Sequence, residues 1–260
     1  MLNSVPVSRR RLMSIRAGLV AGAALPPAAF ARTELKGATF VLVHGAWHGG
    51  WCWRRVSDRL TEKGHYVVAP TLSGLCERSH LASDAIDLST HIDDVAGEIK
   101  WKDLDGIVLV GHSYGGMVIT GVAEKLRDRI SAIVYLDAFQ PDDGQSLYGA
   151  LHAATPAVKM VQPHPASYFH VNEKDQAWVD SKLTPQPVRT FTEELKVTGA
   201  YQSVSKKVYI RAPLFQNAAF DRALERCRAD RTWKTETVTC GHDVMIDQPE
   251  VLTAILEKLV

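Results

Sequence analysis

The sequence has only four cysteines in 260 residues, and none of them stands at a spacing that is typical of a metal site. Charge of one sign is not in excess, since the formal net charge is +1, so the composition argues against a nucleic-acid partner. Beyond residue 31 there is no apolar run long enough to cross a bilayer, and no repeat. What is present, 46% apolar and 23% charged residues, is typical of one globular domain with a sizeable core.

The first 31 residues differ in character from the rest of the chain. Ser8–Met13 carries three consecutive arginines, a weakly apolar stretch rich in alanine and glycine follows, and Ala28–Ala31 reads Ala-Ala-Phe-Ala. This order is typical of a signal peptide cleaved after Ala31, and the paired arginines resemble a twin-arginine export signal. A disordered basic tail is the alternative. Removing residues 1–31 takes away four arginines and no acidic residue, so the net charge changes from +1 to −3. We expect a periplasmic or secreted protein.

Export would bring the cysteines into an oxidising compartment, where a disulfide can form. Four cysteines allow three complete pairings, and the sequence does not choose among them. Small buried thiols are the plainer interpretation for at least two of the four. The residues concerned are Cys52, Cys76, Cys227 and Cys240.

After the leader, apolar strand-like runs alternate with segments of helical spacing. The segment 91–100, for example, places Ile92, Val95 and Ile99 on one apolar stripe. Strands that alternate with helices predict a parallel sheet with helices on both faces. The predicted strands are 39–44, 65–70, 107–110, 130–137, 207–212 and 235–240, and the predicted helices are 56–63, 91–100, 116–125, 218–229 and 249–260.

The alternation stops between about residue 139 and residue 205, where prolines are frequent and no strand pattern is clear. We interpret residues 139–205 as a helical cap inserted after the fourth strand, with residues 32–138 and 206–260 forming the core. The aromatic side chains of the cap either line part of a pocket or form the cap's own core. These aromatic residues are Tyr148, Tyr168, Phe169, Trp178 and Phe191.

The most informative segment is 111–115, which reads Gly-His-Ser-Tyr-Gly and lies between a predicted strand and a predicted helix. A G-x-S-x-G motif in this context predicts a nucleophile elbow, a sharp turn that lifts a serine hydroxyl above the sheet. The helix N-terminus beneath the serine favours developing negative charge. Ser113 is therefore the predicted nucleophile. The backbone N–H groups of Tyr114 and of Ala46, in the glycine-rich loop 44–50, are the expected oxyanion donors.

A serine hydroxyl needs a base, and enzymes with this elbow place their catalytic histidine after the last strand. Of the ten histidines, His242 alone has that position. His44 and His48 are four residues apart, but they span a strand end and a loop rather than a helix, so a metal pair is not expected there. The sequence predicts neither a metal nor a cofactor.

The acid is harder to assign. The turn after the strand 207–212 has no carboxylate, although Asp221 follows in the next helix. Asp137 ends the fourth strand, where a buried carboxylate needs a partner, and His242 would provide it. Asp137 is favoured over Asp221, and a structural Asp137 that caps a turn stays open. The other candidate acids are Asp142, Asp143 and Asp243.

Together these motifs resemble the α/β-hydrolase family of hydroxynitrile lyases, plant methylesterases and bacterial esterases. The resemblance rests on the segments 40–53, 71–80, 110–117 and 240–243. It implies the α/β-hydrolase fold, with a mostly parallel six-stranded sheet and a helical cap, and cofactor-free hydrolysis of small carboxylic esters. We expect the substrate to contact Trp47, His112, Phe139 and Trp178.

The chain departs from the family pattern at two places. Hydroxynitrile lyases of this family carry a threonine where Gly45 stands and a lysine where Asp243 follows the histidine. A lysine stabilises a cyanide leaving group, whereas an aspartate would repel it. The second departure is the acid missing after the strand 207–212. The haloalkane dehalogenase branch of this fold often places its acid where Asp137 falls. That branch uses an aspartate as its nucleophile, whereas this chain has Ser113 at the nucleophile position.

The sequence thus predicts a serine carboxylesterase that hydrolyses small, hydrophobic or aromatic esters through an acyl-enzyme. One alternative is a lyase or another non-hydrolytic enzyme that uses the same site. Another is a receptor-like, ligand-binding protein on a hydrolase scaffold. The expected partner is a small-molecule ester, with no nucleic acid and no membrane, and a homodimer is a possible assembly. Fold analogy does not name the natural ester.

Overall fold

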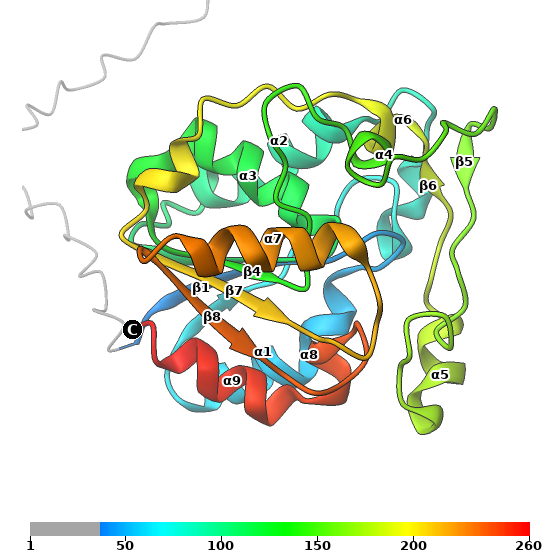
Figure 1. The fold of residues 1–260 in the computed structure, drawn as a ribbon. Coiled ribbons are helices and arrows are strands. Elements are labelled where there is room, and N and C mark those ends of the chain that lie inside the picture. The colour runs from blue at the N-terminus through cyan, green and yellow to red at the C-terminus, as the bar shows by residue number, and fades with distance from the viewer. Residues whose placement is uncertain (1–36) are drawn as a thin grey trace, which may run out of the picture. The chain divides into compact units, whose positions relative to one another are not determined.

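The computed structural model describes residues 37–260, and the predicted leader, residues 1–31, lies outside them (Figure 1). Six strands form one sheet in the order β2-β1-β3-β4-β7-β8, and every neighbouring pair is parallel. The predicted α/β-hydrolase fold is confirmed. The strands are β1 (Thr39–Val43), β2 (Tyr66–Val68), β3 (Ile107–His112), β4 (Ile130–Leu136), β7 (Lys206–Arg211) and β8 (Trp233–Thr237).

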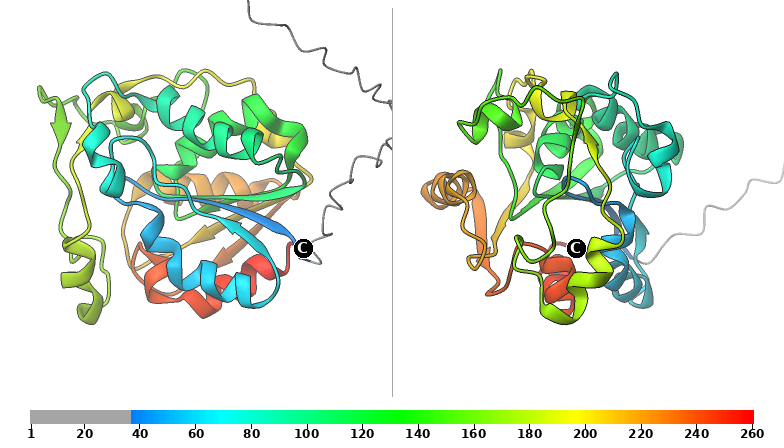
Figure 2. Two further views of the ribbon diagram at one scale, coloured as in Figure 1. Left: turned by 180° about the vertical axis from the view of Figure 1, so that it is seen from behind. Right: turned by 90° about the vertical axis from the view of Figure 1, so that its right-hand side faces the viewer.

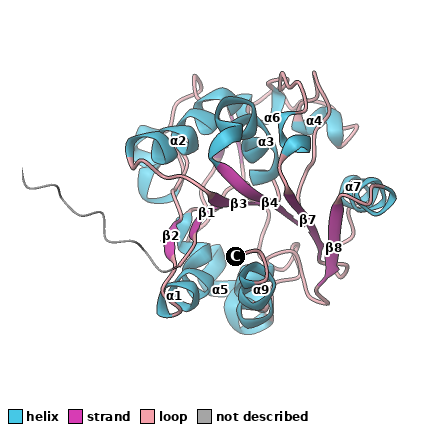
Figure 3. Ribbon diagram, turned by 90° about the vertical axis from the view of Figure 1, so that its left-hand side faces the viewer, coloured by secondary structure: helices cyan, strands magenta, loops and turns pink. Residues whose placement is uncertain are grey.

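Helices cover both faces of this sheet, as Figure 3 shows. Helices α1 and α9 pack against each other on one face, and α2, α3 and α7 lie on the other. Helix α2 begins before residue 91 because the Asp87 side chain accepts a hydrogen bond from the Thr90 N–H and so caps an extra turn. These helices are α1 (Arg54–Glu62), α2 (Leu88–Trp101), α3 (Gly115–Leu126), α7 (Ala218–Ala229) and α9 (Pro249–Glu257).

The chain between β4 and β7 is an insertion of short elements, and part of it stands beside the core (Figure 2). It contains a small antiparallel pair, β5 with β6, where the sequence shows no clear strand pattern. Its elements are α4 (Leu147–Ala150), β5 (Met160–Val161), α5 (Glu173–Asp180), β6 (Gln186–Pro187), α6 (Arg189–Thr192) and η4 (Ala200–Ser203). The remaining short helices are η1 (Gly50–Trp53), η2 (Cys76–Leu81), η3 (Arg127–Arg129) and α8 (Val244–Asp247).

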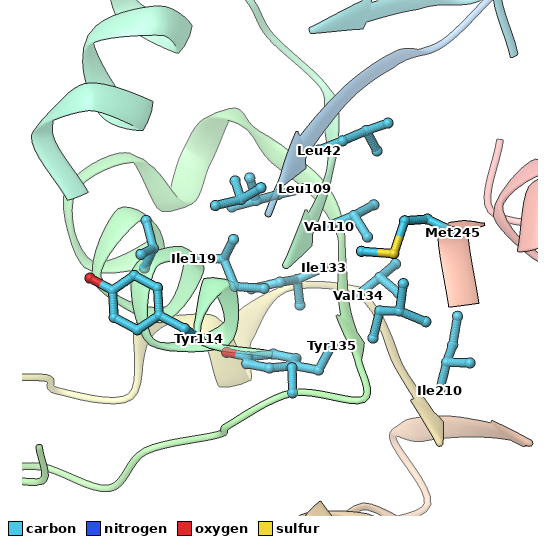
Figure 4. Packing of buried hydrophobic residues seen from close by; sticks show 14 of the residues in the cluster. Leu42, Leu109, Val110, Tyr114, Ile119, Ile133, Val134, Tyr135, Ile210 and Met245 are labelled. Atoms are coloured by element: carbon cyan, nitrogen blue, oxygen red, sulfur yellow. The ribbon is translucent and has the colours of Figure 1, made fainter. Parts of the chain in front are cut away.

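The core lies between the sheet and its helices. Figure 4 shows Ile119 of α3 and Met245 of α8 on either side of side chains from the central strands. Every residue of β3 is buried, as expected for a parallel strand covered on both faces. Strand β8 begins two residues earlier than predicted, because Trp233 pairs with Lys207 of β7. Residues 238–243 are thereby free to form the turn that carries His242.

Candidate functional site

Ser113 lies at the sharp turn between β3 and α3. Its φ of 54° falls in the left-handed region, which is strained for a residue with a side chain. The turn is held by a hydrogen bond from the Ser113 N–H to the Leu136 carbonyl, at 3.2 Å. A Cβ atom at Gly111 would lie 2.6 Å from the Gly115 carbonyl oxygen, and one at Gly115 would lie 2.7 Å from the Val43 carbonyl oxygen. The two glycines of the motif are therefore required by close backbone approaches.

Asp137 and His242 form a buried hydrogen bond. The Nδ1 atom of His242 lies 2.6 Å from Oδ2 of Asp137, and neither side chain is exposed by more than 3%. The other oxygen of Asp137 accepts hydrogen bonds from the Ala212 N–H, at 3.0 Å, and from Nη1 of Arg211, at 2.6 Å. Burial disfavours the Arg211 cation, but the charges of Asp137 and Asp221 and the hydrogen bonds to both carboxylates together raise the pKa of Arg211. The Asp137 carboxylate thus has a buried counter-ion in addition to His242.

The other candidate acids lie elsewhere. Asp221 accepts a hydrogen bond from Nε of Arg211, at 2.8 Å, and its side chain is 57% exposed. Asp142 forms an exposed ion pair with Arg226. Asp143 accepts a hydrogen bond from the Val197 N–H, and the buried Asp243 faces His48 at 3.1 Å. In residues 37–260, the one aspartate hydrogen bonded to the His242 ring is Asp137.

The loop after β1 carries Ala46. Nδ1 of His44 lies 2.8 Å from the Gly45 carbonyl, and the Leu72 N–H donates to Nε2 of the same ring at 3.1 Å. These partners require a neutral ring, and burial lowers the pKa of His44 to about 3. Because Gly45 O and the N–H of Ala46 belong to one peptide group, this histidine orients the Ala46 N–H. Within the described chain, neither this N–H nor that of Tyr114 is paired with an acceptor.

Ser113, His242, Ala46 and Tyr114 line one cavity of about 160 Å³. Its walls are mainly aromatic, and three phenylalanine rings surround the imidazole of His242 at centroid distances of 4.6–5.6 Å. The cavity is lined further by Trp47, Phe139, Leu147, Tyr148, Leu151, Val161, His164, Tyr168, Phe169, Phe191, Phe215, Asn217 and Phe220. Of the five aromatic residues named for the predicted cap, all but Trp178 therefore contribute to the pocket wall.

Two of the residues expected at the substrate lie outside this cavity. Trp178 packs edge-on against Trp51, with ring centroids 5.0 Å apart. His112 is buried behind His242, and its Nε2 atom lies 3.1 Å from the His242 carbonyl. The sequence analysis missed Phe215 and Phe220, which follow β7 outside the predicted cap. It also missed Arg211. The position of this basic residue at the end of a buried strand was a signal that could have identified it.

A second cavity, of about 330 Å³, is also lined by Phe139. It contains neither Ser113 nor His242, and its lining includes Asp142, Arg222 and Arg226. All four cysteines, which fall within residues 37–260, are free thiols. In the same part of the chain, no helix is both long and apolar enough to span a bilayer.

Known proteins resemble this chain in sequence. Residues 40–255 match the model of the alpha/beta hydrolase family. A carbendazim hydrolyzing esterase from Nocardioides sp. is 40% identical over 240 residues, which covers 85% of this chain and 99% of the relative. Methylesterase 2 of Arabidopsis thaliana is 36% identical over 118 residues, 41% of each chain.

Solved structures resemble it in fold. An extracellular alpha/beta-hydrolase from a Paenibacillus species superposes with a TM-score of 0.73 at 23% identity, covering 85% of this chain and 98% of its own. A methylesterase from Arabidopsis gives a TM-score of 0.71 at 24% identity, with coverage of 85% and 98%. The match over most of the chain confirms the resemblance drawn from the motifs. The chain belongs to the alpha/beta hydrolase family.

Proposed function

We propose that this carboxylesterase hydrolyses small hydrophobic or aromatic esters through an acyl-enzyme formed on Ser113. The esterase class follows from the family and from the bacterial esterase relative. The observation that carries the mechanism is the buried hydrogen bond between Asp137 and His242, 2.6 Å long, beside a cavity lined by Ser113 and His242.

The proposed reaction follows from which atom of His242 faces Asp137. The ionised Asp137 carboxylate can only accept a hydrogen bond, so Nδ1 of His242 carries a proton and donates it to Asp137. The Nε2 atom of His242 is then free to accept the proton of Ser113. The serine oxygen then attacks the ester carbonyl, while the N–H groups of Ala46 and Tyr114 stabilise the oxyanion. His242 returns the proton to the leaving alkoxide, which departs as an alcohol. Water repeats the sequence on the acyl-enzyme and releases the acid.

The cavity supports the proposed substrate class. Among the described residues that line it, there is no Asp, Glu, Lys or Arg, so it offers no partner for a charged substituent. Its volume, about 160 Å³, is small beside typical ligand pockets, and its aromatic walls favour flat or apolar groups. A small uncharged ester fits these properties better than a long or ionic one.

Two features favour hydrolysis over the lyase alternative. A Cβ atom at Gly45 would lie 2.8 Å from Nδ1 of His112 and 2.9 Å from Cβ of Ser113, so the threonine of the lyases has no room. The lyase lysine is replaced by Asp243, which is buried against His48 and does not line the cavity. Tight ligand binding without turnover would instead favour the receptor-like alternative.

The test is hydrolysis of p-nitrophenyl esters from acetate to octanoate, with carbendazim added because of the bacterial relative. We expect Ser113→Ala to abolish turnover and Asp137→Asn to lower kcat by about 10⁴-fold, since the histidine loses its orienting carboxylate. Asp221→Asn is the matched control. We expect it to lower kcat by about threefold or less, because the exposed Asp221 carboxylate does not contact His242. A large loss in Asp221→Asn with a small one in Asp137→Asn would contradict the assignment.

We also propose that residues 1–31 are an export leader of the twin-arginine type. The support is the order of arginines, weakly apolar stretch and Ala-Ala-Phe-Ala in the sequence. N-terminal sequencing of the protein from cell fractions of its host tests this. A mature chain that begins at Arg32 outside the cytoplasm is the expected result, and an intact cytoplasmic chain would contradict it.

A further inference from the structure

Beside His242, four other histidines are buried around the site: His44, His48, His91 and His112. The partners of His91 fit a neutral ring, because Nε2 donates to the Ser73 carbonyl while Nδ1 accepts from the Tyr114 hydroxyl. His112 donates through Nε2 to the His242 carbonyl, and its Nδ1 has no partner in the described chain. Burial lowers the pKa of both rings. With His44, three of the four are thus neutral.

His48 differs, because both of its ring nitrogens face acceptors. Nδ1 lies 2.8 Å from the Ala46 carbonyl, and Nε2 lies 3.1 Å from Oδ2 of Asp243. A carbonyl cannot donate, and neither can an ionised carboxylate, so both nitrogens of His48 must carry protons. His48 and Asp243 are 2% and 0% exposed. The two therefore form a buried ion pair.

The surrounding charges agree with this state. Burial disfavours the His48 cation, but the charge of Asp243 and the hydrogen bond to it raise the pKa of His48 overall. Burial likewise opposes the Asp243 anion, yet His48 holds the pKa of that carboxyl well below its usual range. Burial raises the pKa of the nearby Cys52 thiol in η1. The other titratable groups near the pair are His44 after β1, His112 on β3, Cys240, His242, and Asp247 in α8.

The pair joins two loops that carry the proposed chemistry. His48 is two residues after Ala46, and Asp243 directly follows His242. The His48 ring closes back onto the carbonyl of Ala46 itself, while His44 holds the carbonyl before it. Both peptide groups around the Ala46 N–H are therefore fixed by histidines, one neutral and one charged.

We propose that His48 is a positioning residue that is protonated at neutral pH, is held by Asp243 and fixes the oxyanion loop through the carbonyl of Ala46. This rests on the proposed function, in which Ala46 donates to the oxyanion. If His48 lost one of its two ring protons, the deprotonated nitrogen would face an acceptor with a lone pair, either the Ala46 carbonyl or the Asp243 carboxylate. The loop would then lose one of its two ties, and kcat would fall while KM stayed nearly constant, because the oxyanion forms only in the transition state.

The protonation state is tested in the wild-type protein by NMR of ¹⁵N-labelled histidine rings from pH 6 to 8. We expect one buried imidazolium with both nitrogens protonated, assigned by its loss in His48→Gln and its persistence in the exposed control His80→Gln. In Asp243→Asn the ring should be neutral, since the amide can donate to Nε2. A neutral His48 at pH 7 in the wild type would overturn the proposal, whether or not the protein is an esterase.

The positioning role is tested by His48→Leu combined with Asp243→Leu, which removes both charges without leaving one unpaired. We expect kcat to fall about 10- to 100-fold with KM nearly unchanged, and inhibition by phenylboronic acid to weaken in parallel, because its tetrahedral adduct uses the same N–H groups. Wild-type kcat in the folded double variant would overturn the proposal.

Asp243→Asn gives an independent result if the double variant does not fold. In this variant the neutral His48 ring keeps the hydrogen bond to Ala46 without the charge, so the readout is the shape of the pH profile of kcat rather than the rate at one pH. Wild-type kcat should fall as the pH rises through the raised pKa of His48, and this alkaline limb should vanish in Asp243→Asn. The same alkaline limb in both proteins would contradict the role of the pair.

Discussion

At the scale of single residues, three of the seven non-glycine residues with a positive φ in the described chain lie where the chemistry is proposed. Ser113, Asp137 and Trp47 have φ values of 54°, 44° and 62°, all in the left-handed region although none is glycine. Such conformations persist only where the surroundings impose them. Here the Trp47 N–H donates to the buried Gln186 side chain at 2.8 Å, and the Asp137 N–H donates to the Ile210 carbonyl at 2.7 Å. These three strained residues include the proposed nucleophile, the proposed acid and the residue after Ala46 in the proposed oxyanion loop.

Buried neutral histidines make the protein sensitive to acid. The pKa of His44 is lowered by burial to about 3, and that of His91 to about 4, from 6.5. Below pH 6.5 the unfolded chain therefore binds protons that the folded chain does not. The free energy of unfolding consequently decreases as the pH is lowered. Between pH 6.5 and 5 each ring should lower the free energy of unfolding by about 2 kcal/mol. The contribution of His48, whose pKa is raised, is already complete below about pH 6.5.

Urea unfolding at pH 6.5 and at pH 5 measures this fall. His91→Gln is the informative variant, because a glutamine amide can donate to Ser73 and accept from Tyr114 without titrating. We expect its stability to fall by about 2 kcal/mol less than that of the wild type. The exposed His80→Gln should behave as the wild type does. Equal falls in all three proteins would show that buried His91 is not responsible.

At the scale of elements, the site follows from parallel strands. Ala46 follows β1, Ser113 follows β3, Asp137 follows β4, and His242 follows β8. The carboxyl ends of parallel strands meet at one edge of a sheet, so these four positions converge although the sequence separates them widely. The insertion after β4 then supplies pocket wall at the same edge.

The sequence allowed the strands and long helices to be predicted because their periodicity and turn residues are local signals. It also favoured Asp137, because a carboxylate that ends a buried strand needs a partner. Apart from this pairing of Asp137 with His242, pairings across long separations had no local signal. Neither the ion pair between His48 and Asp243 nor the contact of Arg211 with Asp137 could be predicted, since each joins residues from distant segments. For the same reason Trp178, an aromatic of the insertion, was expected at the pocket and lies against Trp51.

At the scale of the whole molecule, the insertion is tied to the core by polar contacts as well as by the pocket wall. Arg55 of α1 donates to both carboxylate oxygens of Asp175 in α5, at 2.8 Å. These hydrogen bonds lower the pKa of Asp175 to about 2. Glu193 accepts from Ser89 at the start of α2. Contacts at several points hold the insertion over the edge of the sheet where the proposed catalytic residues meet.

The most direct test of the account is covalent trapping of the nucleophile in the intact protein. An aryl fluorophosphonate reacts with a serine only when a base and an oxyanion site activate it. Peptide mass spectrometry of the labelled wild type should find one adduct per chain, on Ser113, with esterase activity lost in proportion. Labelling should be absent in Ser113→Ala and strongly slowed in Asp137→Asn. An adduct on another residue, or turnover that persists after Ser113 is fully labelled, would contradict the account.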